Sequence, residues 1–415
     1  MKRNPKTVTA WCLYDWANSA FATTVMAALF PPFFRTLALR AGLSGSQATA
    51  YWGYITSTAL ALVALGAPAL GAMADYAGSR KRFLAVFAGL GILATAASAL
   101  IGAQAWRTAA AVFLCGSVGF TGANIFYESF LPHIASKADM DRISSRGYAL
   151  GYLGGGLLLG LNTLWVARPH WFGIPGSEAA IRLSFLSVAV WWGVFTAPLL
   201  RFVPEPPVDR PSGTVQHTVR QGFLRVMGTL REIRRYRQLM LFLIAFWIYS
   251  DGIGTIIKMA AAFGHEIGIG IPHLAGALLL TQFVGFPCTL LLGRVAGTLG
   301  TKRTILLTLA AYALISMAGF FMRTAAHFYA LAALVGIVQG GSQALSRSLF
   351  AGMIPPGRSA EFFGFFTTSS KFAGIAGPLL LGLIAQLTGN SRLSVLALVV
   401  FFVAGALLLC FVDEK

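Results

Sequence analysis

The sequence predicts an all-α membrane protein of twelve transmembrane helices, arranged as two similar six-helix bundles. Of the 415 residues, 56% are hydrophobic and only 11% are charged, and the mean hydropathy is +0.71. The apolar residues form long runs with short polar connections, and a loop pattern of the first half of the chain returns in the second half. A soluble domain carries roughly 25% charged residues, so lipid must cover most of this surface.

Twelve segments are long enough to span a membrane, which requires about 20 mostly apolar residues. The first segment contains Asp15 and Asn18 and lacks a clear small-x-small cleavage site, so we interpret it as a retained helix and not as a secretory signal. The predicted spans lie near residues 9–34, 47–72, 83–104, 107–131, 146–167, 181–202, 238–263, 272–296, 304–323, 327–352, 362–388 and 392–412.

Basic residues fall mostly on one side of the predicted membrane. With both termini in the cytoplasm, 21 lysines and arginines lie in cytoplasmic segments and 7 lie outside. Cytoplasmic loops carry such an excess. Arginine outnumbers lysine 24 to 8, which favours a bacterial source, so we expect a multi-pass protein of the bacterial inner membrane. The net charge of +18 comes from these loops and forms no continuous patch, so nucleic acid is not an expected partner.

A polar stretch, residues 204–237, separates an N-terminal bundle (residues 1–203) from a C-terminal bundle (residues 238–415). The prolines from Pro204 to Pro211 predict a stiff linker. Apolar residues then recur at helical spacing from Val219 to Ile233, with arginines largely on the other face. This pattern is typical of a basic amphipathic helix, which either lies on an anionic leaflet or packs against the protein.

One loop sequence occurs twice, between helices 2 and 3 and between helices 8 and 9. The first copy is Gly71-Ala-Met-Ala-Asp75-Tyr-Ala-Gly78-Ser-Arg80-Lys81, and at a constant offset of 222 residues it aligns with Gly293-Arg-Val-Ala-Gly297-Thr-Leu-Gly300-Thr-Lys302-Arg303. The glycines permit a turn and close helix approach, and the cations anchor at lipid headgroups. Duplication of a six-helix unit explains the pattern.

The first loop resembles the signature loop of the major facilitator superfamily, and this resemblance implies the major facilitator fold. It also implies a gating role for Asp75 and Arg80, in which the aspartate contacts the other half of the molecule in one conformation. The second copy has Gly297 where Asp75 would be, so it lacks the acidic partner.

A narrower resemblance is to the autophagy-related vacuolar effluxer family and its bacterial relatives. It is carried by three segments: Tyr14-Asp-Trp-Ala-Asn-Ser-Ala-Phe21, Tyr249-Ser-Asp-Gly252, and Gln339-Gly-Gly-Ser-Gln-Ala-Leu-Ser-Arg-Ser-Leu-Phe350 with the later Glu361-Phe-Phe-Gly364. Fungal members of this family are linked to amino-acid export from the vacuole. The resemblance therefore implies a transporter of small solutes.

Carboxylates at membrane depth are candidates for proton coupling. A charge at a helix centre costs about 2.5–3.5 kcal/mol, so such residues face a cavity or a partner. The candidates are Asp15, Glu128 and Asp251. Asp15 shares a polar helix face with Asn18, which indicates a cavity wall or, alternatively, a carboxylate buried for packing. Glu128 fits equally a proton carrier and a salt bridge at the inner rim.

Cations, amides and aromatic residues at similar depth are candidates for the substrate cavity. Arg347 and Lys371 suit a substrate carboxylate or phosphate. Alternatively, Arg347 neutralises Asp15 or Glu128 and never meets a ligand. Gly252 and Gly254 would allow helix 7 to break or bend. The cavity candidates are Tyr14, Asn18, Asn124, Trp247, Tyr249, Lys258, Gln339, Gln343, Arg347 and Lys371.

Together these features predict a secondary transporter that moves a small organic solute, such as an amino acid or another carboxylate-bearing metabolite, by proton-coupled alternating access. The alternatives are an uncoupled facilitator, a channel-like pore and, less favoured, a membrane enzyme. No Walker motif is present, so ATP is not expected to drive transport. The four cysteines lack metal-ligand spacing, and no metal or cofactor is expected. The expected partners are the solute, protons and lipid, and the expected state is a monomer.

Overall fold

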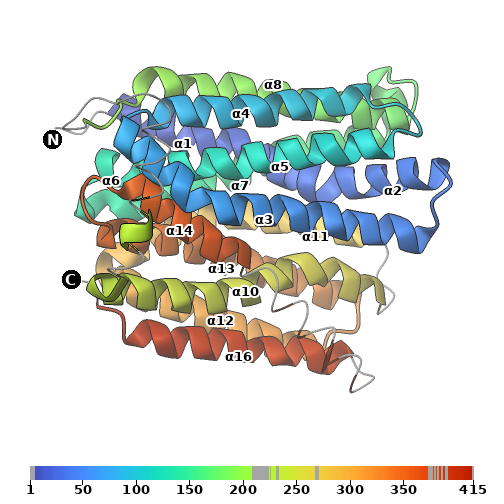
Figure 1. Ribbon diagram of the computed structural model, residues 1–415. Helices are drawn as coiled ribbons and strands as arrows, with labels where there is room; N and C mark the ends of the chain where they lie inside the picture. Colours follow the sequence, from blue (N-terminus) through green and yellow to red (C-terminus); the bar gives the residue numbers. More distant parts are fainter. Residues whose placement is uncertain are drawn as a thin grey trace.

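Long helices packed nearly side by side form the whole described part of the protein (Figure 1). The computed structural model describes residues 5–207, 224, 226–229, 233–266, 271–372, 377, 380, 383–384, 387 and 391–413. The end of the molecule at which α1 begins and α16 finishes is called the terminal end below; both chain ends lie there in Figure 1.

The first half contains six long helical stretches joined by short turns. In chain order its elements are α1 (Pro5–Ala20), η1 (Phe21–Leu29), α2 (Phe30–Arg40), α3 (Gly45–Ala77), α4 (Arg80–Ala97), η2 (Ser98–Leu100), α5 (Trp106–Ser129), α6 (Leu131–Ile134), η3 (Lys137–Asp139), α7 (Met140–Ala167), η4 (Pro169–Phe172) and α8 (Ser177–Phe202).

The second half repeats this arrangement. Its described elements are η5 (Ile233–Tyr236), α10 (Arg237–Glu266), α11 (Ile271–Leu299), α12 (Thr301–Phe320), α13 (Ala325–Met353), α14 (Ser359–Phe372) and α16 (Ser391–Cys410). The predicted fold class is confirmed: 11 described helices are long and apolar enough to cross a membrane. The eleventh predicted span begins with α14, and most of its remainder lies outside the described residues, as does most of the predicted amphipathic helix.

The first span differs from the regular helix that the sequence predicts. Its middle, η1, is π-helical, and the chain then continues as α2 to Arg40, beyond the predicted end near residue 34. Pro31 and Pro32 occupy the first turn of α2, where a missing N–H donor does no harm. Ala22, Thr23 and Met26 of η1 line the central cavity described below, in keeping with the frequent occurrence of π segments at functional sites.

The two halves meet mainly where α3 packs against α14 and α7 against α11, with further contacts of α7 with α13 and of α5 with α14. Glycines bring the backbones together: a Cβ added at Gly364 would lie 2.5 Å from the carbonyl oxygen of Ala67. Gly252 and Gly254 do not break α10, which runs without interruption through both positions. Gly252 instead makes room for Phe402, whose ring carbons would lie 2.9 Å from a Cβ at this position.

Gly119→Ala should destabilise the first half, because the new methyl group would overlap the backbone of Gly91 where α4 and α5 cross. Overpacking of this kind typically costs about 1–3 kcal/mol. Gly89→Ala is the matched control, since nothing lies within 4 Å of a Cβ there. It should be neutral or stabilising, by up to about 1 kcal/mol. Thermal unfolding of the two purified variants in one detergent measures the difference, and equal melting temperatures would contradict this account of the packing.

Candidate functional site

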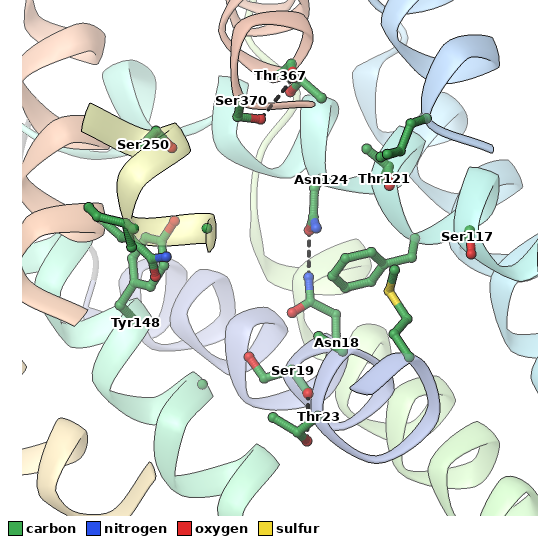
Figure 2. Close-up of a pocket in the computed structure, with 18 of the residues that line it drawn as sticks. Asn18, Ser19, Thr23, Ser117, Thr121, Asn124, Tyr148, Ser250, Thr367 and Ser370 are labelled. Carbon is green, nitrogen blue, oxygen red and sulfur yellow. Dashed lines mark hydrogen bonds between the residues drawn. The ribbon is translucent and has the colours of Figure 1, made fainter. Parts of the chain in front are cut away.

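A cavity of about 880 Å³ lies between the two halves. Hydroxyl and amide groups dominate its polar lining, and several of these side chains point toward one another in Figure 2. Such groups donate and accept hydrogen bonds without carrying charge. The polar lining comprises Asn18, Ser19, Thr23, Thr56, Ser57, Ser117, Thr121, Asn124, Tyr148, Tyr152, Tyr249, Ser250, Gln282, Gln339, Ser342, Gln343, Ser346, Thr367 and Ser370, with Asp15 and Glu128.

Five of the predicted cavity residues lie in this lining. Asn18 donates from Nδ2 to Oδ1 of Asn124 at 2.5 Å, which joins α1 to α5 (Figure 2). Tyr249 lies 2.7 Å from the hydroxyl of Ser346 and so connects α10 with α13. The remaining members are Gln339 and Gln343, both on α13.

Other predicted cavity residues lie elsewhere. The Tyr14 side chain is fully buried outside the lining, and Trp247 is 43% exposed and also outside it. Trp247 lies four residues before Asp251 on α10, which turns the helix by about 40° more than a full circle, and Trp247 is exposed whereas Asp251 is buried. The side chains of Lys258 and Lys371 lie outside the described part of the structure.

The guanidinium of Arg347, on α13, lies in a socket formed by the first half. It is 1% exposed, and Nη1 and Nη2 each lie 3.2 Å from Oδ2 of Asp15. Its Nε donates to the Ser144 hydroxyl and its Nη2 to the Ser144 carbonyl, both at 2.9 Å. Asp15 borders the cavity, whereas Arg347 does not. This geometry corresponds to the alternative in which Arg347 neutralises Asp15.

Three aromatic rings of the first half complete the socket. The guanidinium carbon lies 4.8, 5.6 and 4.2 Å from the ring centroids of Trp11, Tyr127 and Tyr148, respectively. These are cation–π distances. The Tyr127 hydroxyl also donates to Oδ2 of Asp15 at 2.7 Å. A cation of the second half is therefore bound almost entirely by groups from α1, α5 and α7.

Glycine at position 147 is required for this arrangement. A Cβ at Gly147 would lie 2.5 Å from Oδ2 of Asp15 and 3.1 Å from Nη2 of Arg347. Any side chain here would push the two charged groups apart. Sequence reasoning missed Gly147, Ser144 and the aromatic rings because their role depends on contacts between distant segments.

The first copy of the repeated loop closes the terminal end through a carboxylate. Asp75 is 3% exposed and accepts the backbone N–H groups of Ala360 at 3.2 Å and Glu361 at 2.9 Å. These donors belong to the first turn of α14, where a helix has no internal acceptors and carries partial positive charge. Arg80 binds the same carboxylate, with Nη2 2.7 Å from Oδ1. The contact across the halves that the family resemblance implies is thus present.

The turn of the first loop is fixed locally. Gly78 adopts φ +58° at the end of α3, a conformation that favours glycine. Glu205, just after α8, accepts the backbone N–H groups of Arg80 at 2.6 Å and Lys81 at 3.0 Å and so caps α4. The beginning of the linker is thereby bound to the same loop as Asp75.

The second copy of the loop uses different chemistry, as Gly297 leads us to expect. Thr301, next to Gly300 with its φ of +92°, donates to Oδ2 of Asp141 at the start of α7 at 2.7 Å. A Cβ at Gly293 would lie 2.5 Å from the side chain of Ser145, so this glycine again allows close approach of the halves.

The two cations of this second copy do not cross between the halves in any described contact. Lys302 binds the carbonyl groups of Cys410 and Val412, at 2.8 Å each, and so holds the end of α16. Arg303 is exposed.

The three carboxylates proposed for proton coupling have different surroundings. Asp15 and Glu128 border the cavity. Asp251 is 1% exposed, does not line the cavity, and accepts the backbone N–H of Gly377 at 2.9 Å. A Cβ at Gly377 would approach Asp251 and Thr255, so these segments pack too closely for a solute between them.

Two membrane-embedded helical halves around a polar cavity, with each repeated loop bound to a helix start of the other half at one end, define a transporter with the major facilitator fold. Solved structures agree with this fold. The human organic anion transporter MFSD10 superimposes with a TM-score of 0.76 at 15% identity over 98% of this chain and 100% of that one. The proton:xylose symporter XylE gives a TM-score of 0.75 at 15% identity over 98% and 95% of the two chains.

The chain belongs to the Atg22 family: the family model described as "Vacuole effluxer Atg22 like" matches residues 3–415. A Bacillus subtilis protein named "Uncharacterized MFS-type transporter YxiO" is 38% identical over all of this chain and 96% of its own length. The autophagy-related protein 22 of Yarrowia lipolytica is 29% identical over 66% of this chain and 50% of its own. The alignment thus spans only about half of this fungal relative's length.

Arg347→Ala should destabilise the protein strongly, because it leaves the buried Asp15 carboxylate without its guanidinium. Breaking a buried pair from one side costs about 3–5 kcal/mol. The double variant Asp15→Ala/Arg347→Ala should lose less than the sum of the two single variants, since no uncompensated charge remains. Thermal unfolding of all four proteins in detergent measures this coupling.

A surface ion pair provides the control for this cycle. Arg40 and Glu178 lie 3.0 Å apart with side chains 45% and 47% exposed. Arg40→Ala should therefore cost less than about 1 kcal/mol. Additive effects of Asp15→Ala and Arg347→Ala would show that the buried pair carries no special coupling.

Proposed function

We propose that the protein is a secondary active transporter of the bacterial inner membrane that moves a small organic solute by alternating access. The observation that carries this proposal is a polar cavity bordered by both halves, whose terminal end is closed by contacts between the halves. These contacts are the binding of Arg347 in its socket, the hydrogen bonds from the first turn of α14 to the Asp75 carboxylate, and the Asp141–Thr301 hydrogen bond. Each can break as the halves rock, which would open the cavity to the other side.

The basic loops support a cytoplasmic location for the terminal end. Arg80, Lys81, Lys302 and Arg303 all belong to the loops at this end, and cytoplasmic loops are enriched in such residues. The closed terminal end then corresponds to a conformation whose cavity faces away from the cytoplasm.

The lining supports a solute that combines hydrogen-bonding groups with charge, such as an amino acid or another carboxylate-bearing metabolite. Asn18, Asn124 and Gln343 offer amides for neutral polar groups, and the carboxylates of Asp15 and Glu128 suit an ammonium group. Arg347 is sealed in its socket, so recognition of a substrate carboxylate falls to Lys371 in this proposal.

The Asp15–Arg347 pair supports proton coupling. When the halves separate at the terminal end, the guanidinium leaves with α13 and Asp15 remains at the cavity with the first half. A carboxylate that loses its countercharge in a low-dielectric site favours the neutral, protonated form. Proton binding and guanidinium binding at Asp15 would therefore alternate during the transport cycle. Glu128, also at the cavity, is a second candidate.

Asp15→Asn should uncouple transport from the proton gradient. The amide keeps the size of the side chain but removes the proton-binding group, so concentrative uptake into proteoliposomes should be lost. It also removes the countercharge of Arg347, so solute exchange should persist at a reduced rate in the folded protein. A thermal-shift screen of amino acids, peptides and organic anions first identifies the solute. Glu178→Gln, an exposed carboxylate on α8, is the control and should transport normally. Wild-type uptake that continues unchanged after collapse of the pH gradient would indicate an uncoupled facilitator and overturn the coupling.

Lys371→Ala should weaken binding of a carboxylate-bearing solute by tenfold or more, about 1.4 kcal/mol. It should leave the affinity for the corresponding amide, which lacks the carboxylate, nearly unchanged. Lys137→Ala, an exposed lysine in η3, is the matched control. Equal losses for acid and amide, or no loss in a folded variant, would argue against this role.

A further inference from the structure

His133 lies at the junction of the two halves at the terminal end and belongs to neither copy of the repeated loop. It sits on the short helix α6. Its Nε2 is 2.7 Å from Nη1 of Arg80, on α4, and 3.0 Å from the hydroxyl of Ser359, on α14 of the second half. Arg80 in turn binds Asp75, the carboxylate that holds the first turn of α14. The imidazole is thus part of the same inter-half contact.

The chemistry of the guanidinium determines the protonation state of His133 in this contact. Arginine has only donors and stays charged at every physiological pH. The nitrogen that faces Arg80 must therefore be an acceptor, which requires a neutral imidazole with its proton on Nδ1. The Ser359 hydroxyl, which faces the same nitrogen, is then also a donor. The closed arrangement needs the neutral ring.

We propose that His133 is a pH sensor in this gate: protonation at Nε2 breaks its contact with Arg80, disturbs the Arg80–Asp75 pair that holds α14, and makes the terminal end open more readily. The protonated ring can no longer accept a hydrogen bond. It also places a second positive charge at contact distance from the guanidinium of Arg80, and a like charge this close repels it.

The charged groups on the elements next to α6 bind other residues or border the cavity. At the start of α14, Glu361 binds Arg358, the residue just before the helix, at 2.8 Å. On α7, Asp141 binds Thr301, and on α13, Arg347 lies in its socket. On α5, Glu128 borders the cavity. Asp75 attracts the guanidinium of Arg80, whereas a protonated His133 would repel it. The position of Arg80 therefore depends on both groups.

The direction of the effect follows from linkage. In the closed gate the start of α14 holds the imidazole beside Arg80, which disfavours a proton on Nε2. Withdrawal of α14 would free the ring to turn away from Arg80 and bind the proton near pH 6.5, the pKa of an unperturbed histidine. Acid therefore favours the open gate. Between pH 7.5 and pH 5.5 the ratio of open to closed molecules should rise about tenfold. The effect on transport rests on the proposed alternating access, but gate opening can be measured without transport.

The experiment uses the full-length chain with its four cysteines replaced by serine and spin labels attached at Ala138→Cys and Arg237→Cys. Both positions are exposed at the terminal end, one in each half. Pulsed electron paramagnetic resonance in lipid nanodiscs gives the distance distribution at pH 7.5 and 5.5. The long-distance population should grow about tenfold relative to the short one at the lower pH.

His133→Gln tests the residue itself. The glutamine carbonyl can accept from Arg80 but does not titrate, so this variant should keep the short distance at both pH values. His170→Gln, an exposed histidine in η4 at the opposite end, is the matched control and should respond to pH as the wild type does. A wild type whose distances ignore pH, or a His133→Gln protein that still responds to it, would overturn the sensor.

A third variant separates this inference from the proposed function. Asp75→Asn weakens the carboxylate contact with α14 and should lengthen the distance at both pH values. If it does so while wild type is insensitive to pH, the gate opens but His133 is not its sensor. If the distance stays short in every protein, Asp75→Asn included, both the sensor and alternating access are wrong.

Discussion

The burial of one guanidinium is the constraint on which the closed terminal end depends. Arg347 belongs to the second half, but its hydrogen-bonding partners and the rings around it belong to the first. A cation removed from water is tolerated only when hydrogen bonds and an opposite charge replace its hydration. The neighbouring sequence follows from this requirement: Asp15 supplies the charge, Ser144 two acceptors, and Gly147 the space in which the pair can meet.

The two copies of the repeated loop have diverged in chemistry while keeping glycines at the same positions. Gly71 and Gly293 leave no room for a side chain between the halves, and Gly78 and Gly300 both have positive φ, although their ψ values differ. In the first copy the carboxylate is Asp75, which belongs to the loop itself. In the second copy it is Asp141, at the start of α7 in the other half. The Asp75 carboxylate accepts two backbone N–H groups in a buried position, whereas the Asp141 carboxylate accepts one hydroxyl, that of Thr301, in a half-exposed position. The first contact is the stronger. The two loops therefore differ in how strongly they bind the other half.

The spans, the duplication and the turn glycines could be predicted because hydropathy and repeats are local properties of the sequence. Charges at depth were also recognised one by one, since Asp15 and Arg347 each stand in an apolar run. Their pairing was left open because 332 residues separate them, and helical spacing says nothing about partners on other helices. The same limit explains Asp251, whose carboxylate accepts the backbone N–H of Gly377 and lies outside the cavity lining, although Ser250 and Gly254 on the same helix border the cavity. Nothing in the sequence signalled the π-helical course of η1.

If the halves separated at the terminal end, the carboxylates of Asp15 and Asp75 would each lose partners from the second half. Withdrawal of α13 takes the countercharge from Asp15, and withdrawal of α14 takes two backbone donors from Asp75. Asp75 keeps Arg80 within its own half, so its charge remains balanced. Asp15 has no such local cation among the contacts described for it and retains only the Tyr127 hydroxyl. The cost of opening is therefore concentrated at Asp15, next to the cavity, where a proton or a cationic group of the solute can offset it. In the proposed transport cycle, the movement of the halves would thus be coupled to whatever occupies that one carboxylate.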